Sequence, residues 1–138
     1  MTAIDSNPFE LARQMFADDV ASRAAGVEIV EIGTGHATAT MTVTETMVNG
    51  HGITHGGYVF LLADTTFALA CNSHGERAVG ARADIRYILP TRRGETLTAI
   101  AEERIRFGRN GIYDVTVVDE EHRVIAEFRG DSRVISIH

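Results

Sequence analysis

One stretch near the middle of the chain joins a glycine-rich polar loop to a long apolar helix. The loop 49–57 carries one asparagine, two histidines and four glycines, which is not the pattern of a packed segment. The run 58–72 that follows places apolar residues on every side of a helix, and Asp64 is its one carboxylate. Burying a carboxylate costs free energy unless a partner or a function requires it. The fold therefore has to cover this helix, and Asp64 becomes the first candidate for a functional side chain.

A helix without a polar face has to be surrounded, and a curved antiparallel sheet is the simplest cover. Segments rich in β-branched residues and bounded by turn residues predict a hairpin and then four consecutive strands in a meander. These segments are 27–32, 36–43, 78–89, 95–107, 112–119 and 123–137. We therefore predict an α+β fold, in which a curved antiparallel sheet of about six strands wraps around a long central apolar helix, residues 57–73.

Residues 1–25 form an N-terminal helical segment, in which one helix is predicted from Asn7 to about Ala25. Asn7 is a capping residue, Pro8 suits the first helical position, and Gly26 ends the helix. The segment precedes the hairpin, and nothing in the sequence separates the two with a linker.

Length and composition bound the class of protein. The 138 residues fit one domain, 1–138, with 44% hydrophobic and 23% charged residues, and the net charge of −6 argues against nucleic-acid binding. The single cysteine, Cys71, excludes a disulfide framework and is expected to be a buried structural thiol in a reducing cytoplasm. No signal peptide is apparent, and the apolar run 58–63 is too short to span a bilayer. We expect a cytoplasmic protein with neither a membrane nor a nucleic-acid partner.

The order of elements and the motif in the loop resemble the hotdog-fold acyl-CoA thioesterases, and among them those of phenylacetic acid degradation. The triplet His55–Gly57 alone is weak evidence, because glycine-rich turns are common. The resemblance becomes specific because Asp64 follows the triplet at the family's spacing, inside an apolar helix that ends in Ala70–Ser73. The matching residues cover nearly the whole chain: Asn49, His55–Gly57, Phe60, Leu62–Asp64, Phe67, Ala68, Ala70–Ser73, Ala78, Val79, Pro90, Gly94–Ala99, Tyr113–Asp114 and Phe128–Gly130.

The resemblance implies hydrolysis of acyl-CoA thioesters, with aryl-acetyl or hydroxyphenylacetyl groups as the acyl class. Gly56 and Gly57 leave the helix entrance uncovered, so that their N–H groups and the helix dipole form an oxyanion hole. Asp64 acts as general base on water or as nucleophile, and the sequence does not separate these roles. Asn49, which both donates and accepts hydrogen bonds, orients the water. His55 orders the loop or contacts the thioester.

Asp64 lies about two helical turns from Gly56, too far to serve the same pocket in one chain. The resemblance implies a homodimer with active sites at its interface, in which each carboxylate faces the glycine turn of the other copy, and a homotetramer built from such dimers. Coenzyme A is part of the substrate, so no cofactor is expected. Arg92 and Arg109 are candidate contacts for its phosphates, because arginine forks to phosphate oxygens.

No metal site is expected, although His51, His55, Asp64 and His74 are potential ligands, because the glycine-broken loop does not align its histidines on one helical face. Two alternatives stay open within the same fold. One is a non-catalytic sensor of acyl-CoA or aromatic acids, which would release no coenzyme A. The other is a dehydratase of 3-hydroxyacyl thioesters, which would need a histidine base paired with an acid.

Overall fold

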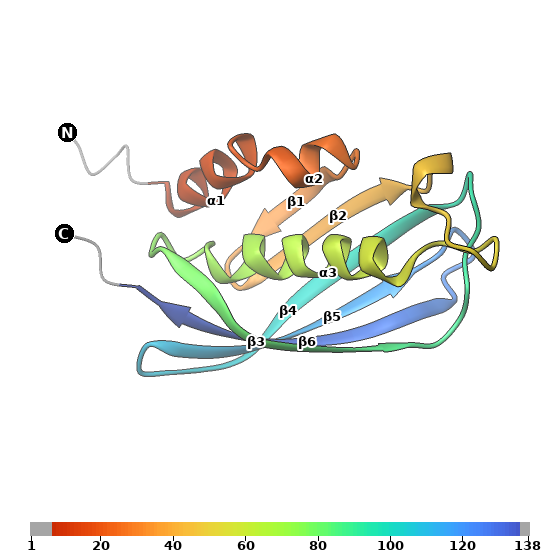
Figure 1. The fold of residues 1–138 in the computed structure, drawn as a ribbon. Coiled ribbons are helices and arrows are strands. Elements are labelled where there is room, and N and C mark those ends of the chain that lie inside the picture. The colour runs from red at the N-terminus through yellow and green to blue at the C-terminus, as the bar shows by residue number, and fades with distance from the viewer. Residues whose placement is uncertain (1–6, 136–138) are drawn as a thin grey trace.

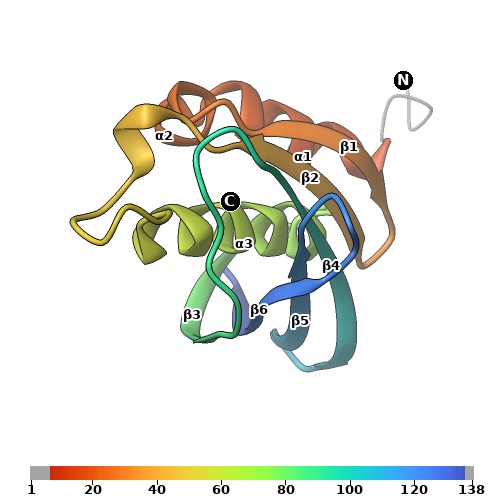
Figure 2. The same ribbon diagram turned by 90° about the vertical axis from the view of Figure 1, so that its right-hand side faces the viewer.

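The computed structural model describes residues 7–135, in which a six-stranded antiparallel sheet curves around one long helix (Figure 1). The helices are α1 Pro8–Ala17, α2 Val20–Ala24, the short 3₁₀ helix η2 Glu45–Met47 and α3 Gly56–Cys71. The strands are β1 Glu28–Gly33, β2 His36–Thr42, β3 Ala78–Tyr87, β4 Thr96–Phe107, β5 Asn110–Val118 and β6 Val124–Val134. The view in Figure 2 shows the sheet bending around α3, with α1 and α2 beside it. The predicted architecture, a curved antiparallel sheet of six strands around a central apolar helix, is confirmed.

The apolar helix α3 begins and ends at polar side chains. His55 caps its first turn, and Asn72 closes its last. The Asn72 side chain donates to the carbonyls of Ala68 (2.9 Å) and Ala78 (3.0 Å), and its Oδ1 accepts from the Ala78 N–H at 2.9 Å. One buried side chain therefore both ends the helix and fixes the start of β3. The helix occupies Gly56–Cys71, where the sequence predicts 57–73.

Phe67 is the centre of the contact between α3 and the sheet. Its ring is 1% exposed and lies edge-on to Tyr113, with 5.7 Å between ring centroids. A Cβ added at Gly130 would lie 2.8 Å from two carbons of the Phe67 ring, and one added at Gly80 would lie 3.2 Å away. Two strands therefore carry glycine where the ring meets the sheet, and this lets α3 sit close to β3 and β6.

The N-terminal segment contains two helices where the sequence predicts one. The predicted cap at Asn7 is confirmed, since its side chain accepts from the Phe9 N–H at 2.9 Å. The chain then leaves the helix at Asp18, and Asp19 caps α2 by accepting from the Ser22 N–H (2.9 Å) and hydroxyl (2.6 Å). A short acidic side chain that bonds nearby backbone favours a cap over a helix interior, which explains the break.

The four C-terminal strands do not form a consecutive meander, and this prediction is wrong. The sheet order is β1-β2-β4-β5-β6-β3, so β3 pairs with β6 at the edge and β4 pairs with β2. The segment 88–95 after β3 contains Pro90 and is longer than a tight hairpin loop. It crosses the end of the sheet instead of reversing, and only β4, β5 and β6 follow one another as neighbours.

The sheet does not enclose α3 completely. Residues at helical spacing on one face stay partly open to solvent: Gly57, Phe60, Leu61, Asp64 and Ala68. We refer to these five residues as the open face of α3. The sheet, α1 and α2 together cover the other sides of the helix and leave this strip uncovered. Across residues 7–135, none of the helices has the length and apolar character needed to cross a membrane.

The contact between Phe67 and Gly130 predicts a stability effect. Gly130→Ala places a methyl group within van der Waals overlap of the Phe67 ring, and overpacking of this kind costs about 1–3 kcal/mol. Urea unfolding followed by circular dichroism should show a lower midpoint than the parent protein. Gly50→Ala is the matched control, since a Cβ there meets nothing within 4 Å. Equal midpoints for the two variants would contradict the close approach of α3 to β6.

Candidate active site

A cavity of about 430 Å³ lies at the N-terminal end of α3. Most of its wall is apolar and comes from three segments that are distant in the sequence. The lining residues are Asn49, Ile53 and Thr54 from the loop, Gly56 and Val59 from α3, and Tyr87–Thr91 with Ile125 from the sheet. An apolar cleft with a few converging polar groups is the usual form of a small-molecule site.

Two threonines hold the loop against the segment that follows β3. The Thr54 N–H donates to the Thr91 carbonyl at 2.9 Å, and the two hydroxyls lie 2.7 Å apart. Both side chains are buried. The His55 N–H also donates to the Met47 carbonyl, at 2.7 Å. These bonds fix both sides of the cavity entrance, so that the start of α3 has a defined position.

Asn49 lies in the cavity wall, but half of its amide is already engaged. Its Oδ1 accepts from the N–H groups of His51 (2.9 Å) and Ile53 (3.3 Å), which holds the loop in a tight turn. No acceptor for its NH₂ group is found among the described residues. The NH₂ group of Asn49 can therefore donate a hydrogen bond into the cavity. Its Oδ1, which the sequence also predicts to act on the substrate side, instead stabilises the loop.

The two glycines at the start of α3 differ in what their N–H groups do. His55 Nδ1 accepts from the Gly57 N–H at 2.9 Å, so that this donor is engaged in the helix cap. Within residues 7–135 the Gly56 N–H has no hydrogen-bond acceptor, and Gly56 lines the cavity. The N-terminus of a helix carries partial positive charge, which makes an unpaired N–H there a suitable donor to a negative oxygen.

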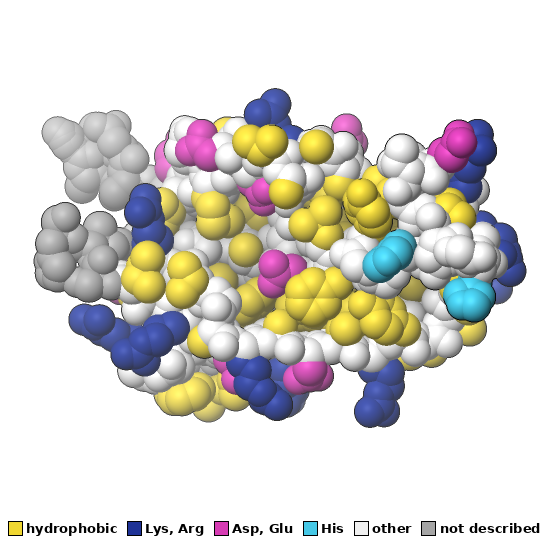
Figure 3. Space-filling model, in the orientation of Figure 1, with side chains coloured by type: hydrophobic (Ala, Val, Ile, Leu, Met, Phe, Trp, Pro, Cys, Tyr) yellow, Lys and Arg dark blue, Asp and Glu magenta, His cyan; other side chains and the backbone are white. Residues whose placement is uncertain are grey.

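Asp64 lies on the open face of α3 and not in the cavity wall. Figure 3 shows an acidic side chain among hydrophobic ones over α3, and Asp64 is the one acidic residue of that helix. Burial raises the pKa of Asp64 above its ordinary value, and the negative charge of Asp19 raises it further. Among the described residues no arginine or histidine forms an ion pair with it, so a structural ion pair does not explain its presence.

The distance along α3 separates the donor from the carboxylate. Eight residues at 1.5 Å each place Asp64 about 12 Å from Gly56 along the helix axis. Asp64 instead lies near the middle of the helix, one turn after Phe60 and Leu61, which are its neighbours on the open face. In a single chain the two predicted groups are therefore not brought together.

The remaining predicted residues have different positions. Arg92 is exposed and follows Thr91 at the cavity wall. Arg109 lies in the turn after β4, a strand of 12 residues that spans about 35 Å, so it is at the opposite end of the sheet from the cavity of its own chain. Burial raises the pKa of the Cys71 thiol to about 12, which makes it an inert core side chain. No cluster of three or more metal-ligating side chains occurs in the part of the chain that the structure describes.

Sequence reasoning missed the wall that Tyr87–Thr91 contributes to the cavity. Tyr87 is 52% exposed, and its hydroxyl donates to the Gly56 carbonyl at 2.9 Å. The available signal was a run of three large apolar residues before Pro90 with no strand-like alternation. The run indicates an apolar surface that a strand with one buried face would not have. The sequence does not show that this surface contacts the start of α3.

Comparison with known proteins shows the family to which the chain belongs. The model of the Thioesterase superfamily matches residues 51–126. The acyl-coenzyme A thioesterase PaaI of Escherichia coli K12 is 43% identical over 124 residues, covering 90% of this chain and 89% of the relative.

Solved structures agree with this placement. The E. coli PaaI protein from the phenylacetic acid degradation operon superposes with a TM-score of 0.91 at 41% identity, covering 94% of both chains. A hypothetical thioesterase from Streptococcus pneumoniae TIGR4, solved with coenzyme A, has a TM-score of 0.83 at 26% identity, covering 89% of this chain and 96% of that one. The protein therefore belongs to the thioesterase superfamily and has its hotdog fold, as the sequence resemblance predicts.

Proposed function

We propose that this protein hydrolyses acyl-coenzyme A thioesters to the free acid and coenzyme A, with aryl-acetyl or hydroxyphenylacetyl groups as the acyl class. The observation that carries the proposal is a Gly56 N–H that lies at the edge of an apolar cavity and has no acceptor within residues 7–135, on the same helix as a partly buried carboxylate, Asp64. The likeness to E. coli PaaI, named an acyl-coenzyme A thioesterase, supports the substrate class.

The Gly56 N–H is the proposed oxyanion donor. Thioester hydrolysis passes through a tetrahedral state in which the carbonyl oxygen becomes negative, and a fixed donor in a dry site stabilises that charge. The positive end of the α3 dipole adds to the effect. We favour Gly56 over Gly57, because the Gly57 N–H is already donated to His55. His55 then acts on the loop and the cap, and its exposed ring is free to contact the thioester at its Nε2 side.

Asp64 is the proposed base or nucleophile, and it acts on the cavity of a second copy. As general base it takes a proton from water while the water oxygen attacks the carbonyl carbon and the C–S bond breaks to release the coenzyme A thiolate. As nucleophile its oxygen attacks that carbon, the thiolate leaves, and water then cleaves the mixed anhydride. Both routes need the carboxylate ionised. The Asn49 NH₂ group is the donor that would hold the water or the acyl oxygen.

The edge of the sheet supports a homodimer. β3 lies at the edge, so that one side of its backbone has no strand partner within the described chain. Large apolar side chains are exposed on and after it, among them Val79 (47%), Tyr87 (52%) and Ile88 (47%). Long exposed edges of this kind invite pairing with another chain. Pairing of two β3 strands would bring the open faces of two α3 helices beside each other, and a tetramer of such dimers would cover more of that surface.

Coenzyme A enters the proposed reaction as part of the substrate, and water is the only other reactant. Arg92, exposed beside Thr91 at the cavity, is the proposed contact for a coenzyme A phosphate. Arg109 reaches a cavity only across a subunit interface, because the cavity of its own chain lies at the other end of the sheet.

A panel of thioesters tests the proposed activity. We expect release of free coenzyme A, measured with a thiol reagent, to be fastest for phenylacetyl-CoA and hydroxyphenylacetyl-CoA. Palmitoyl-CoA should react at least about tenfold more slowly in kcat/KM, because a flexible sixteen-carbon chain lacks the compact aromatic shape of the proposed acyl class. Binding of the panel without release of coenzyme A would favour the non-catalytic sensor and contradict the proposal. Elimination of water from a 3-hydroxyacyl thioester would favour the dehydratase.

Asp64→Asn tests the role of the carboxylate. We expect kcat to fall by about two to three orders of magnitude with little change in KM, because the lost group acts in the transition state. Burial raises the pKa of Asp64, so the ionised carboxylate destabilises the fold above that pKa. The melting temperature of the variant should therefore be unchanged or higher at neutral pH. A variant with normal kcat would refute the assignment.

The pH dependence of the parent enzyme gives a second measure of Asp64. Activity requires the carboxylate, so kcat/KM should fall as pH falls through the raised pKa. The acid limb is expected above the ordinary value of 3.8 and should disappear in the residual activity of Asp64→Asn. A limb at or below the ordinary value would mean that another group controls the reaction.

A further inference from the structure

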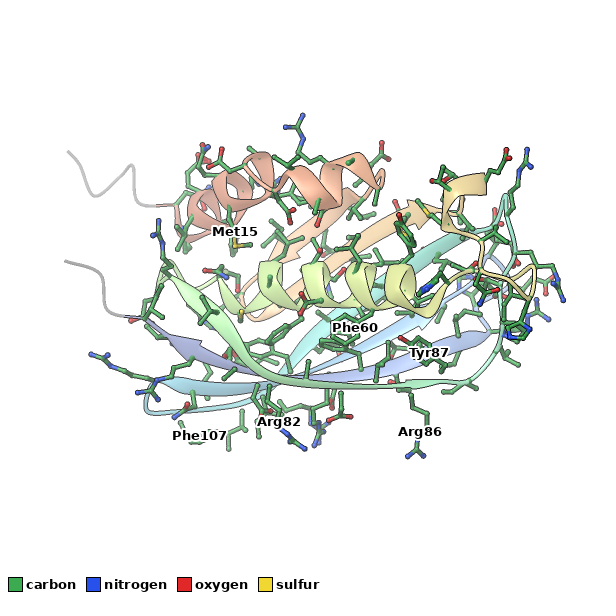
Figure 4. All side chains as sticks on the ribbon, viewed as in Figure 1. Met15, Phe60, Arg82, Arg86, Tyr87 and Phe107 are labelled. Atoms are coloured by element: carbon green, nitrogen blue, oxygen red, sulfur yellow. The ribbon has the colours of Figure 1, made fainter. Side chains whose placement is uncertain are left out.

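Tyr87 makes two contacts with the first residue of α3. Its hydroxyl donates to the Gly56 carbonyl at 2.9 Å. Its ring lies so close that a Cβ added at Gly56 would be 2.9 Å from Cζ and 3.0 Å from the hydroxyl oxygen. Figure 4 shows Tyr87 beneath the first turn of α3, while the neighbouring Arg86 projects from the opposite side of the sheet. A side chain at position 56 would therefore displace the Tyr87 ring from its contact with α3.

The two ends of one peptide group are held by different side chains. Tyr87 binds the carbonyl of the Gly56–Gly57 peptide, and His55 Nδ1 accepts from the N–H of the same peptide at 2.9 Å. Because a peptide group is planar, two contacts at opposite ends fix its orientation. Two consecutive glycines would otherwise leave the first turn more rotational freedom than any other pair of residues.

Fixing this plane also constrains the neighbouring peptide, whose N–H belongs to Gly56 and has no acceptor among the described residues. A donor contributes to catalysis through its fixed direction before the reaction, since it then needs no reorganisation in the transition state. Burial raises the pKa of the Tyr87 hydroxyl, so it stays protonated and remains a donor at neutral pH.

We propose that Tyr87 is a positioning residue for thioester hydrolysis: by holding the Gly56–Gly57 peptide from β3, it orients the free Gly56 N–H toward the acyl oxygen. This inference rests on the proposed function, because it takes that N–H as the oxyanion donor. Within a single chain Tyr87 is 52% exposed, and replacing it by phenylalanine keeps the part of its ring that is buried. Its hydroxyl contributes more to the geometry of the site than to the stability of the fold.

Tyr87→Phe removes the hydroxyl and keeps the ring. The loss of one hydrogen bond between neutral groups, worth about 0.5–1.5 kcal/mol, should lower kcat about two- to tenfold with little change in KM and should lower the melting temperature by no more than a few degrees. Tyr58→Phe is the matched control, because Tyr58 follows Gly57 in the same helical turn and its hydroxyl makes no hydrogen bond to a described residue. Its kcat should remain that of the parent.

A readout independent of catalysis is the backbone amide resonance of Gly57, recorded by ¹H–¹⁵N NMR on the full chain. The ¹⁵N shift of an amide responds to hydrogen bonding at the carbonyl of its own peptide, so Tyr87→Phe should move the Gly57 signal and leave the Ser73 signal in place. Parent kcat in Tyr87→Phe, or an unmoved Gly57 signal, overturns the inference while the proposed function stands. A parent protein that hydrolyses no thioester refutes the proposed function and this inference with it.

Discussion

The burial of one apolar helix is the constraint on which the rest of the structure depends. α3 has polar groups at its two ends and a single carboxylate between them, so it cannot lie on a surface exposed to water. The curved sheet covers it through close contacts such as that of Phe67 with Gly130, and α1 and α2 cover part of the rest. One strip remains open, and Asp64 lies in it. A second copy of the chain packed against that strip would complete the burial of α3.

The same helix separates the chemistry of the site into two halves. Its N-terminus supplies a Gly56 N–H that lies at a cavity and has no acceptor in the described part of the chain, and Tyr87 and His55 bind the peptide that follows it. Its middle supplies a carboxylate whose pKa is raised by burial. The two lie about 12 Å apart along the axis, too far for one acyl group in one chain. A complete site would therefore need the Gly56 N–H of one subunit and the Asp64 carboxylate of another.

Local signals in the sequence predict most of the elements but not their pairing. The cap at Asn7, the limits of α3 and the first hairpin follow from local residue preferences. The edge position of β3 does not, because pairing with β6 depends on contacts far apart in the chain. The break at Asp19 was missed because a cap and an interrupted apolar stripe look alike in sequence. Tyr87 was missed because its role exists only where β3 meets the start of α3.

Subunit complementation tests the shared site most directly. Asp64→Asn leaves the Gly56 half intact, and Gly56→Val, which would clash with Tyr87, leaves the Asp64 half intact. Each variant alone should be almost inactive, with its fold checked by circular dichroism. Equal amounts refolded together should recover about a quarter of the parent activity per chain, because half of the dimers then contain one intact site. A mixture no more active than its two components would contradict a site built from two copies.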